Sequence, residues 1–299
     1  METPTTLGST HSMVTSSVEA WRQLAIPGVI CVFLLAGIYG SILPGLFSDW
    51  WTDPNYSHGF LVPLFSGYWV WQQKNTLKTV SPSGSWTGLF VLLVGVGILI
   101  LGDVGAEEFL TRSSLIIILA GLVLLHLGTR VLRLLFFPLM FLFFMIPLPM
   151  ILFNAVAFPL QGFAARNATA VLDFMGVPVL RDGNVIHLSH ITLGVTEACS
   201  GIRSLVSLLA LAVAWAHLTL PGTLARMMLI VAAVPITIIA NAGRVVMTGL
   251  IGQWFGVDYA QGVFHSLSGW IIFLVAFAGL LGVYRVLLLQ GISLKPTKT

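Results

Sequence analysis

A cysteine near the middle of the chain, Cys199, is the residue with the clearest capacity for covalent chemistry. It lies in the segment Ala-Cys-Ser-Gly-Ile at 198–202, directly before a long apolar run. A helix beginning there would direct its positive dipole end toward the sulfur and favour the thiolate, which is the nucleophilic form. The sequence therefore predicts that Cys199 is a nucleophile.

Two residues further along the chain have the side chains that such a thiolate needs. Arg244 lies near the end of one apolar run, and His265 begins the next. An imidazole can take the thiol proton and return it to a leaving amine. A guanidinium is permanently charged and can stabilise the oxyanion of a tetrahedral intermediate. The predicted chemistry is acyl transfer from a peptide bond through a thioester.

Four more polar residues are candidates for supporting this trio, although each has an ordinary structural alternative. Arg203 follows the cysteine by four residues and so shares its helix face, where it can lower the thiol pKa or bind a substrate carboxylate. Glu197 is a candidate helix cap, and Asn241 can hold the arginine or line the pocket. His58 is the rival general base, with a structural role as the alternative.

Composition places these residues in a membrane protein. The chain has 299 residues, of which 57% are hydrophobic and only 8% charged, whereas soluble domains have about 25% charged residues. The net charge of +3 is typical of basic cytoplasmic loops and does not indicate nucleic-acid binding. Two cysteines make no disulfide framework, and no metal or cofactor motif is visible, so we expect no metal and no cofactor.

Hydropathy predicts an all-α polytopic membrane protein with about eight transmembrane helices, since about 20 apolar residues cross a bilayer. We expect residues 1–20 to be a disordered cytoplasmic N-terminus, 21–290 a single transmembrane domain and 291–299 a short cytoplasmic tail. The expected spans are 24–43, 59–71, 87–101, 113–128, 134–152, 202–220, 227–243 and 266–289.

The stretch between the fifth and sixth spans does not resemble a further span. Residues 153–175 are amphipathic and predict a helix lying in the interface, with a tilted span as the alternative. Residues 177–195 contain Asp-Gly-Asn at 182–184 between β-prone runs, which predicts a short β-hairpin. That hairpin would lead the chain into Cys199.

The distribution of charge predicts the orientation. With a cytoplasmic N-terminus, nine Lys and Arg residues lie on the cytoplasmic side and five on the other, which agrees with the positive-inside rule. Both termini are then cytoplasmic. The same arrangement brings Cys199, Arg244 and His265, from three different spans, to the extracytoplasmic face.

The ordered motifs resemble the exosortase/archaeosortase family. They are the segment Ala-Cys-Ser-Gly-Ile-Arg-Ser at 198–204, Asn241 with Arg244, His265 at the last span, and Tyr-Ser-His-Gly-Phe-Leu-Val-Pro at 56–63. This resemblance implies a cysteine protease and transpeptidase of the bacterial inner membrane or archaeal membrane. It also implies catalytic roles for Cys199, Arg244 and His265.

The resemblance further implies the partners. They are the lipid bilayer and secreted proteins whose C-terminal sorting signal has a short motif, often Pro-Glu-Pro, then one span and a basic tail. Cleavage near the motif would pass the new C-terminus to water or to another acceptor. No nucleic-acid partner is expected.

Two other functions remain open from the sequence. A polytopic chain with polar groups can be a transporter or channel, although the acidic residues here avoid the spans and no internal repeat is visible. An intramembrane protease using Ser200 is the other alternative, but the adjacent thiol is the better nucleophile.

Overall fold

The structure is a computed structural model that describes residues 21–195, 201–256, 259 and 263–290, with the backbone alone for 263–266. The chain divides into two compact units, Met1–Pro149 and Met150–Thr299. The expected N-terminal and C-terminal tails lie outside the described residues.

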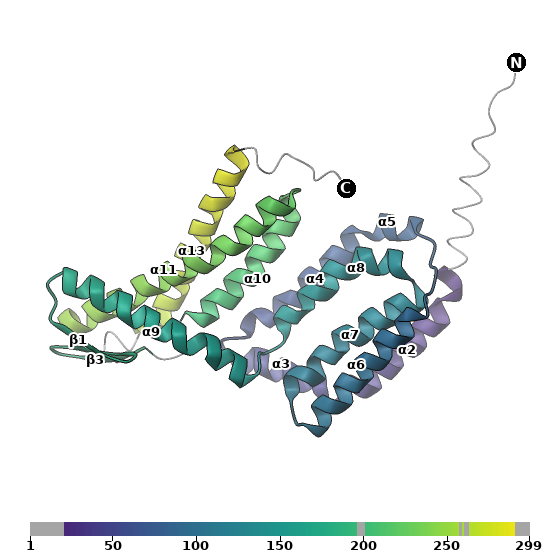
Figure 1. Cartoon of the computed structure of the whole chain (residues 1–299), viewed down its shortest axis with the longest axis horizontal. Helices are drawn as coiled ribbons and strands as arrows, with labels where there is room; N and C mark the ends of the chain where they lie inside the picture. The colour runs from purple at the N-terminus through teal and green to yellow at the C-terminus, as the bar shows by residue number, and fades with distance from the viewer. Residues whose placement is uncertain (1–20, 196–200, 257–258, 260–262, 291–299) are drawn as a thin grey trace, which may run out of the picture. The chain divides into compact units, whose positions relative to one another are not determined.

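Helices make up most of both units, as the sequence predicts (Figure 1). The first unit contains α2 (Ala25–Tyr39), α3 (Ile42–Thr52), η1 (Ser57–Phe60), α4 (Leu61–Gln72), α5 (Lys74–Thr79), α6 (Thr87–Val104), α7 (Glu108–His126), α8 (Thr129–Phe141) and η2 (Leu142–Met145). The second contains α9 (Met150–Phe174), β1 (Val179–Asp182), β2 (Val185–Leu188), β3 (Thr192–Gly194), α10 (Ile202–Thr219), α11 (Thr223–Phe255) and α13 (Val263–Leu289).

Six of the described helices are long and apolar enough to cross a membrane, or up to seven if a bent helix pair counts as one span. The polytopic all-α fold is therefore confirmed, and among the described helices six or seven meet this criterion where about eight spans were expected. The expected span at 59–71 is the 12-residue α4, which is short for a crossing. The expected span at 134–152 falls on the bent pair Thr129–Met145 and Met150–Phe174.

The first unit contains a closely packed helical hairpin formed by α6 and α7 (Figure 1). Three glycines of α6, seven residues apart, face α7. A Cβ on Gly95 would lie 2.7 Å from the Ile118 side chain, and one on Gly102 would lie 2.6 Å from the Thr111 nitrogen. The third, Gly88, faces the Leu125 backbone. Because these positions lack side chains, the two backbones approach closely, as in other membrane helix pairs.

Polar contacts hold one end of the first unit together. Arg112 in α7 is buried and forms ion pairs with Asp49 of α3, at 2.6 Å, and with Glu108, at 2.7 Å. Trp50 of α3 donates from Nε1 to the carbonyl oxygen of Met145 at 2.8 Å. Buried charges need such partners, because an unpaired guanidinium in an apolar interior is very costly.

The predicted hairpin is present in the second unit and has a third strand that the sequence analysis did not predict. The order is β1-β2-β3, with both pairs antiparallel. One face of this sheet packs on α9 and α11 through a core of Ala164, Ala165, Ala168, Leu172, Ile186, Leu188, Ile191, Leu193, Val195, Val245 and Leu250. The sheet is therefore anchored on these two helices as far as Val195.

The helices α10, α11 and α13 pack on one another through small side chains such as Ala212, Ala216, Ala233 and Ala276. Helix α11 has 33 residues, so it is about 50 Å long at 1.5 Å per residue. The expected span at 227–243 is its central part. Arg244, expected at a helix end, lies instead inside α11, because the helix continues for three turns beyond it.

Candidate active site

The side chain of Arg244 is buried within the second unit, with 8% of the residue exposed. Its Nε atom donates a hydrogen bond to the Oγ atom of Ser268 in α13 at 2.9 Å. Ser268 is itself 3% exposed. The guanidinium also lies against the next residue, since a Cβ added to Gly269 would be 3.9 Å from Nη2. One bond to a buried hydroxyl therefore joins α11 to α13 at this point.

Asn241, one turn before Arg244 on α11, contacts the start of α10. It is 3% exposed, and a Cβ added to Gly201 would lie 2.8 Å from its Cγ atom. Gly201 has φ of +80°, a left-handed conformation that glycine adopts without strain. Gly201 is thus required both by its backbone conformation and by the close approach of Asn241.

The predicted catalytic cysteine and Glu197 lie outside the described residues. The chain is fixed on both sides of them. Val195 is 1% exposed and donates its N–H to the Asn184 carbonyl oxygen at 2.9 Å. On the other side, α10 begins at Ile202, as expected, with Gly201 as its cap. Cys199 therefore lies within three residues of a helix N-terminus.

Asn184 anchors the sheet to α9. Its Nδ2 atom donates to Oε1 of the buried Gln161 at 3.2 Å and to the Val195 carbonyl oxygen at 3.1 Å. The turn residue that predicted the hairpin thus also ties the end of the sheet to a helix.

The predicted base His265 is in the first turn of α13, and its side chain is not described. It precedes Ser268 by three residues, so the two positions share a helix face. The Arg244–Ser268 bond therefore brings the face of α13 that includes position 265 toward α11. Arg203 lies in the first turn of α10 and is exposed.

His58 lies in η1 of the first unit. Its Nε2 atom is 3.1 Å from the carbonyl oxygen of Phe144, to which the protonated nitrogen donates. Burial lowers the pKa of His58 below 6.5, and hydrogen bonds to the backbone of Phe144 and Asn55 oppose this effect. These contacts favour the structural interpretation of His58, as a tie between η1 and η2.

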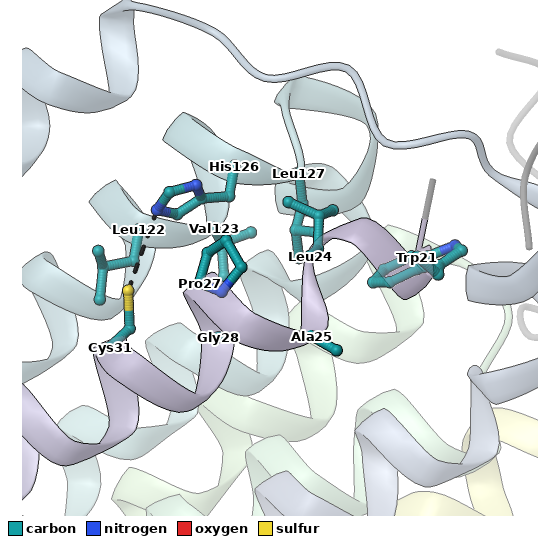
Figure 2. Close-up of a pocket in the computed structure, with 10 residues that line it drawn as sticks. All are labelled: Trp21, Leu24, Ala25, Pro27, Gly28, Cys31, Leu122, Val123, His126 and Leu127. Carbon is teal, nitrogen blue, oxygen red and sulfur yellow. Dashed lines mark hydrogen bonds between the residues drawn. The ribbon is translucent and has the colours of Figure 1, made fainter. Parts of the chain in front are cut away.

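A cysteine and a histidine approach each other in the first unit (Figure 2). Cys31 Sγ lies 4.0 Å from His126 Nε2, in a cavity of about 330 Å³ between α2 and α7. The remaining lining is mostly apolar: Trp21, Leu24, Ala25, Pro27, Gly28, Leu122, Val123 and Leu127. The residues lining this cavity include no guanidinium, which favours a packing role for Cys31.

Within the part of the chain that the structure describes, no group of three or more His, Cys, Asp or Glu side chains is arranged to hold a metal ion.

Comparison with known protein families supplies the decisive observation. The family model described as transmembrane exosortase (Exosortase_EpsH) matches residues 50–282. The chain belongs to the transmembrane exosortase family. No curated protein and no solved structure matches it. Family membership supports a general role for this exosortase in processing sorting signals, as a multi-pass membrane protein.

Two contacts near the predicted site of the exosortase were not predicted from the sequence: that of Ser268 with Arg244 and that of Gly201 with Asn241. The residue type of Ser268 does not indicate a role, because one serine in an apolar run is commonplace. Its spacing from His265, one helical turn, was the available clue. Gly201 was noted as part of the motif, but its contact with Asn241 depends on how two helices pack.

Proposed function

We propose that this exosortase is a cysteine protease and transpeptidase that cleaves C-terminal sorting signals of secreted proteins. Cys199 attacks the scissile carbonyl, and the bond to the leaving amine breaks to give a thioester. His265 takes the thiol proton and delivers it to that amine. Arg244 stabilises the oxyanion. Water or an acceptor amine then takes the acyl group and restores the thiol.

The observation that carries this proposal is the buried guanidinium of Arg244, bonded to α13 at Ser268. Asn241, one turn away on the same helix, is in contact with Gly201 at the start of α10. These contacts support convergence of the three motifs, because Gly201 follows Cys199 by two residues and Ser268 follows position 265 by one helical turn.

The setting supports the choice of Arg244 as the oxyanion-stabilising group. A guanidinium in a water-poor interior interacts with a developing negative charge far more strongly than one in bulk water. Holding it at Nε also fixes the plane of the guanidinium before the reaction begins. A guanidinium kept in one place needs little reorganisation when the charge appears.

The test is processing of a secreted reporter protein that ends in a Pro-Glu-Pro motif, one span and a basic tail. The Cys199→Ala variant is expected to accumulate the uncleaved reporter. Cys31→Ala removes the other cysteine, the one beside His126, and is expected to process the reporter normally. A folded Cys199→Ala variant that still cleaves, or loss of cleavage in Cys31→Ala alone, would contradict the proposal.

We further propose that the site faces the extracytoplasmic side of the inner membrane, with both termini in the cytoplasm. This proposal keeps all eight expected crossings, so it requires η1 and α4 to cross the membrane together as one short span. Its support is the excess of basic residues on the cytoplasmic side in that arrangement. Secreted substrates would reach such a site after translocation, while their own C-terminal span is still in the bilayer.

A further inference from the structure

The three-stranded sheet before Cys199 has an open edge. Strand β3 pairs with β2 in the register Ile186↔Leu193 and His187↔Thr192. Leu188 donates its N–H to Ile191, and Val195 donates to Asn184. Because antiparallel pairing alternates, Ile191, Leu193 and Val195 direct their N–H and C=O groups toward β2.

Thr192 and Gly194 therefore direct their N–H and C=O groups away from the sheet. Among the described residues, no hydrogen bond reaches these outward backbone groups. Both residues are exposed, whereas Leu193 between them is buried in the core that the sheet shares with α9 and α11. The buried side chain of Leu193 thus fixes β3 on the core, and its outer edge presents two N–H donors and two C=O acceptors.

We propose that β3 binds the substrate as an added β-strand, through the outward backbone groups of Thr192 and Gly194. The occupant is an extended polypeptide, because its own N–H and C=O groups repeat every two residues, about 6.8 Å, as those of β3 do. A helical segment has already satisfied its backbone groups and cannot pair with this edge. The inference rests on the proposed function, since it names how that site holds its substrate.

The position of β3 in the chain favours this edge over the opposite one. Gly194 precedes Cys199 by five residues, so the sulfur-bearing residue lies within about 18 Å even in a fully extended chain. The opposite edge belongs to β1, which packs against α9 and is two strands further away. A peptide of about five residues on β3 spans the distance to the nucleophile.

The first test uses binding to the Cys199→Ala variant, which keeps the sheet but lacks the nucleophile. The probes are synthetic peptides with a Pro-Glu-Pro motif, each carrying one N-methylated amide at a different position. Strand addition predicts that N-methylation weakens binding about tenfold at alternate positions and leaves the positions between them unchanged. The proposal is overturned if N-methylation has the same effect on binding at every position, or if it weakens binding at consecutive positions.

The second test changes the enzyme. Thr192→Pro deletes one outward N–H but no bond to β2, and is expected to weaken binding of the unmethylated peptide about tenfold. Thr192→Val keeps that N–H and removes only the hydroxyl that contacts His187. Arg181→Pro removes an outward N–H from the far edge, at β1. Both controls are expected to bind the peptide normally.

Two results with the enzyme variants contradict strand addition. One is normal binding by a folded Thr192→Pro variant. Another is concentration-dependent dimerisation that Thr192→Pro abolishes while peptide binding persists, which would make a second copy of the chain the occupant. If Thr192→Pro fails to fold, the N-methyl scan decides alone. Cleavage by Cys199→Ala would refute the proposed function, whereas a flat N-methyl scan would refute only the role of β3.

Discussion

At the scale of single residues, the most informative feature is the burial of Arg244 and its bond to Ser268. A buried guanidinium with an identified acceptor is held in one orientation, which is what stabilisation of a developing charge requires. Thr248 lies one turn further along α11 and donates its hydroxyl to the backbone carbonyl of Arg244 at 2.9 Å. Substituting Ser268 therefore tests the contact with the guanidinium, and substituting Thr248 is the control for general packing.

The first prediction concerns Ser268. Ser268→Ala removes the acceptor for Arg244 Nε, so kcat for reporter cleavage is expected to fall about 10- to 100-fold, less than for loss of an oxyanion donor itself. KM should change little, because the lost interaction serves the transition state. Thr248→Val should retain wild-type kinetics. Ser268→Thr should recover part of the rate, whereas a purely structural role would lower the amount of folded protein and leave kcat intact.

The second prediction follows from the lowered pKa of His58. Above pH 6.5 the residue is neutral in both the folded and the unfolded chain. Below that pH the unfolded chain takes up the proton first, because burial keeps the folded pKa lower. The free energy of unfolding is therefore expected to fall as pH decreases from about 6.5, until the folded pKa is passed.

The measurement for His58 is thermal unfolding in detergent from pH 7.5 to pH 5. The wild-type protein should lose more stability over this range than His58→Gln, which retains a donor for the Phe144 carbonyl. Equal losses in the two proteins would show that His58 does not titrate as described.

At the scale of elements, the segment that contains Cys199 is preceded by the three-stranded sheet and followed by α10. The sheet is fixed on α9 and α11, and Gly201 is fixed against Asn241. The sequence predicted both the hairpin, from Asp-Gly-Asn, and the start of α10. It did not predict β3, because three residues are too few to show an alternating pattern.

Other parts of the fold were less predictable for identifiable physical reasons. Polar Asn241 and Arg244 suggested a helix end, but both are buried by tertiary contacts and α11 continues past them. Apolar residues 59–71 suggested a span, although their helix has only 12 residues. The catalytic roles of Cys199, Arg244 and His265 came from motif order, and they remain predictions for experiment.

The third prediction tests the contact between Gly201, at the start of α10, and Asn241 of α11. Gly201→Ala forces a left-handed residue, at a cost of about 1–2 kcal/mol, and places a methyl group 2.8 Å from Asn241 Cγ. Its melting temperature in detergent should fall by roughly 2–8 °C, because a unit of this size loses about 2–4 °C per kcal/mol. Gly162→Ala, in α9, meets no atom within 4 Å and should be neutral or slightly stabilising. An unchanged melting temperature for Gly201→Ala would contradict the contact.

At the scale of the whole molecule, membership of the transmembrane exosortase family covers residues 50–282 and includes every predicted catalytic position. Among the described helices, five of the six candidate spans lie wholly or mostly within this region, and the sixth, Trp21–Tyr39, precedes it. Orientation then decides whether the site meets its substrates, since a secreted protein exposes its processed end only on the far side of the membrane.

The fourth prediction addresses that orientation. A cysteine introduced at Ala106, in the turn between α6 and α7, should react with a membrane-impermeant maleimide in intact cells. A cysteine introduced at Lys78, in α5, should react only after the membrane is opened. Both variants should lack Cys31 and Cys199, so that neither native thiol adds background. The reverse pattern of labelling would place the predicted site in the cytoplasm.

The most direct measurement of the central claim is mass spectrometry of the enzyme quenched with acid during turnover of the sorting-signal reporter. The account predicts a thioester between Cys199 and the new C-terminus of the reporter, lost on treatment with hydroxylamine and absent from Arg244→Ala. Cleavage at the normal rate with no adduct on Cys199, or an adduct on Cys31 instead, would contradict it.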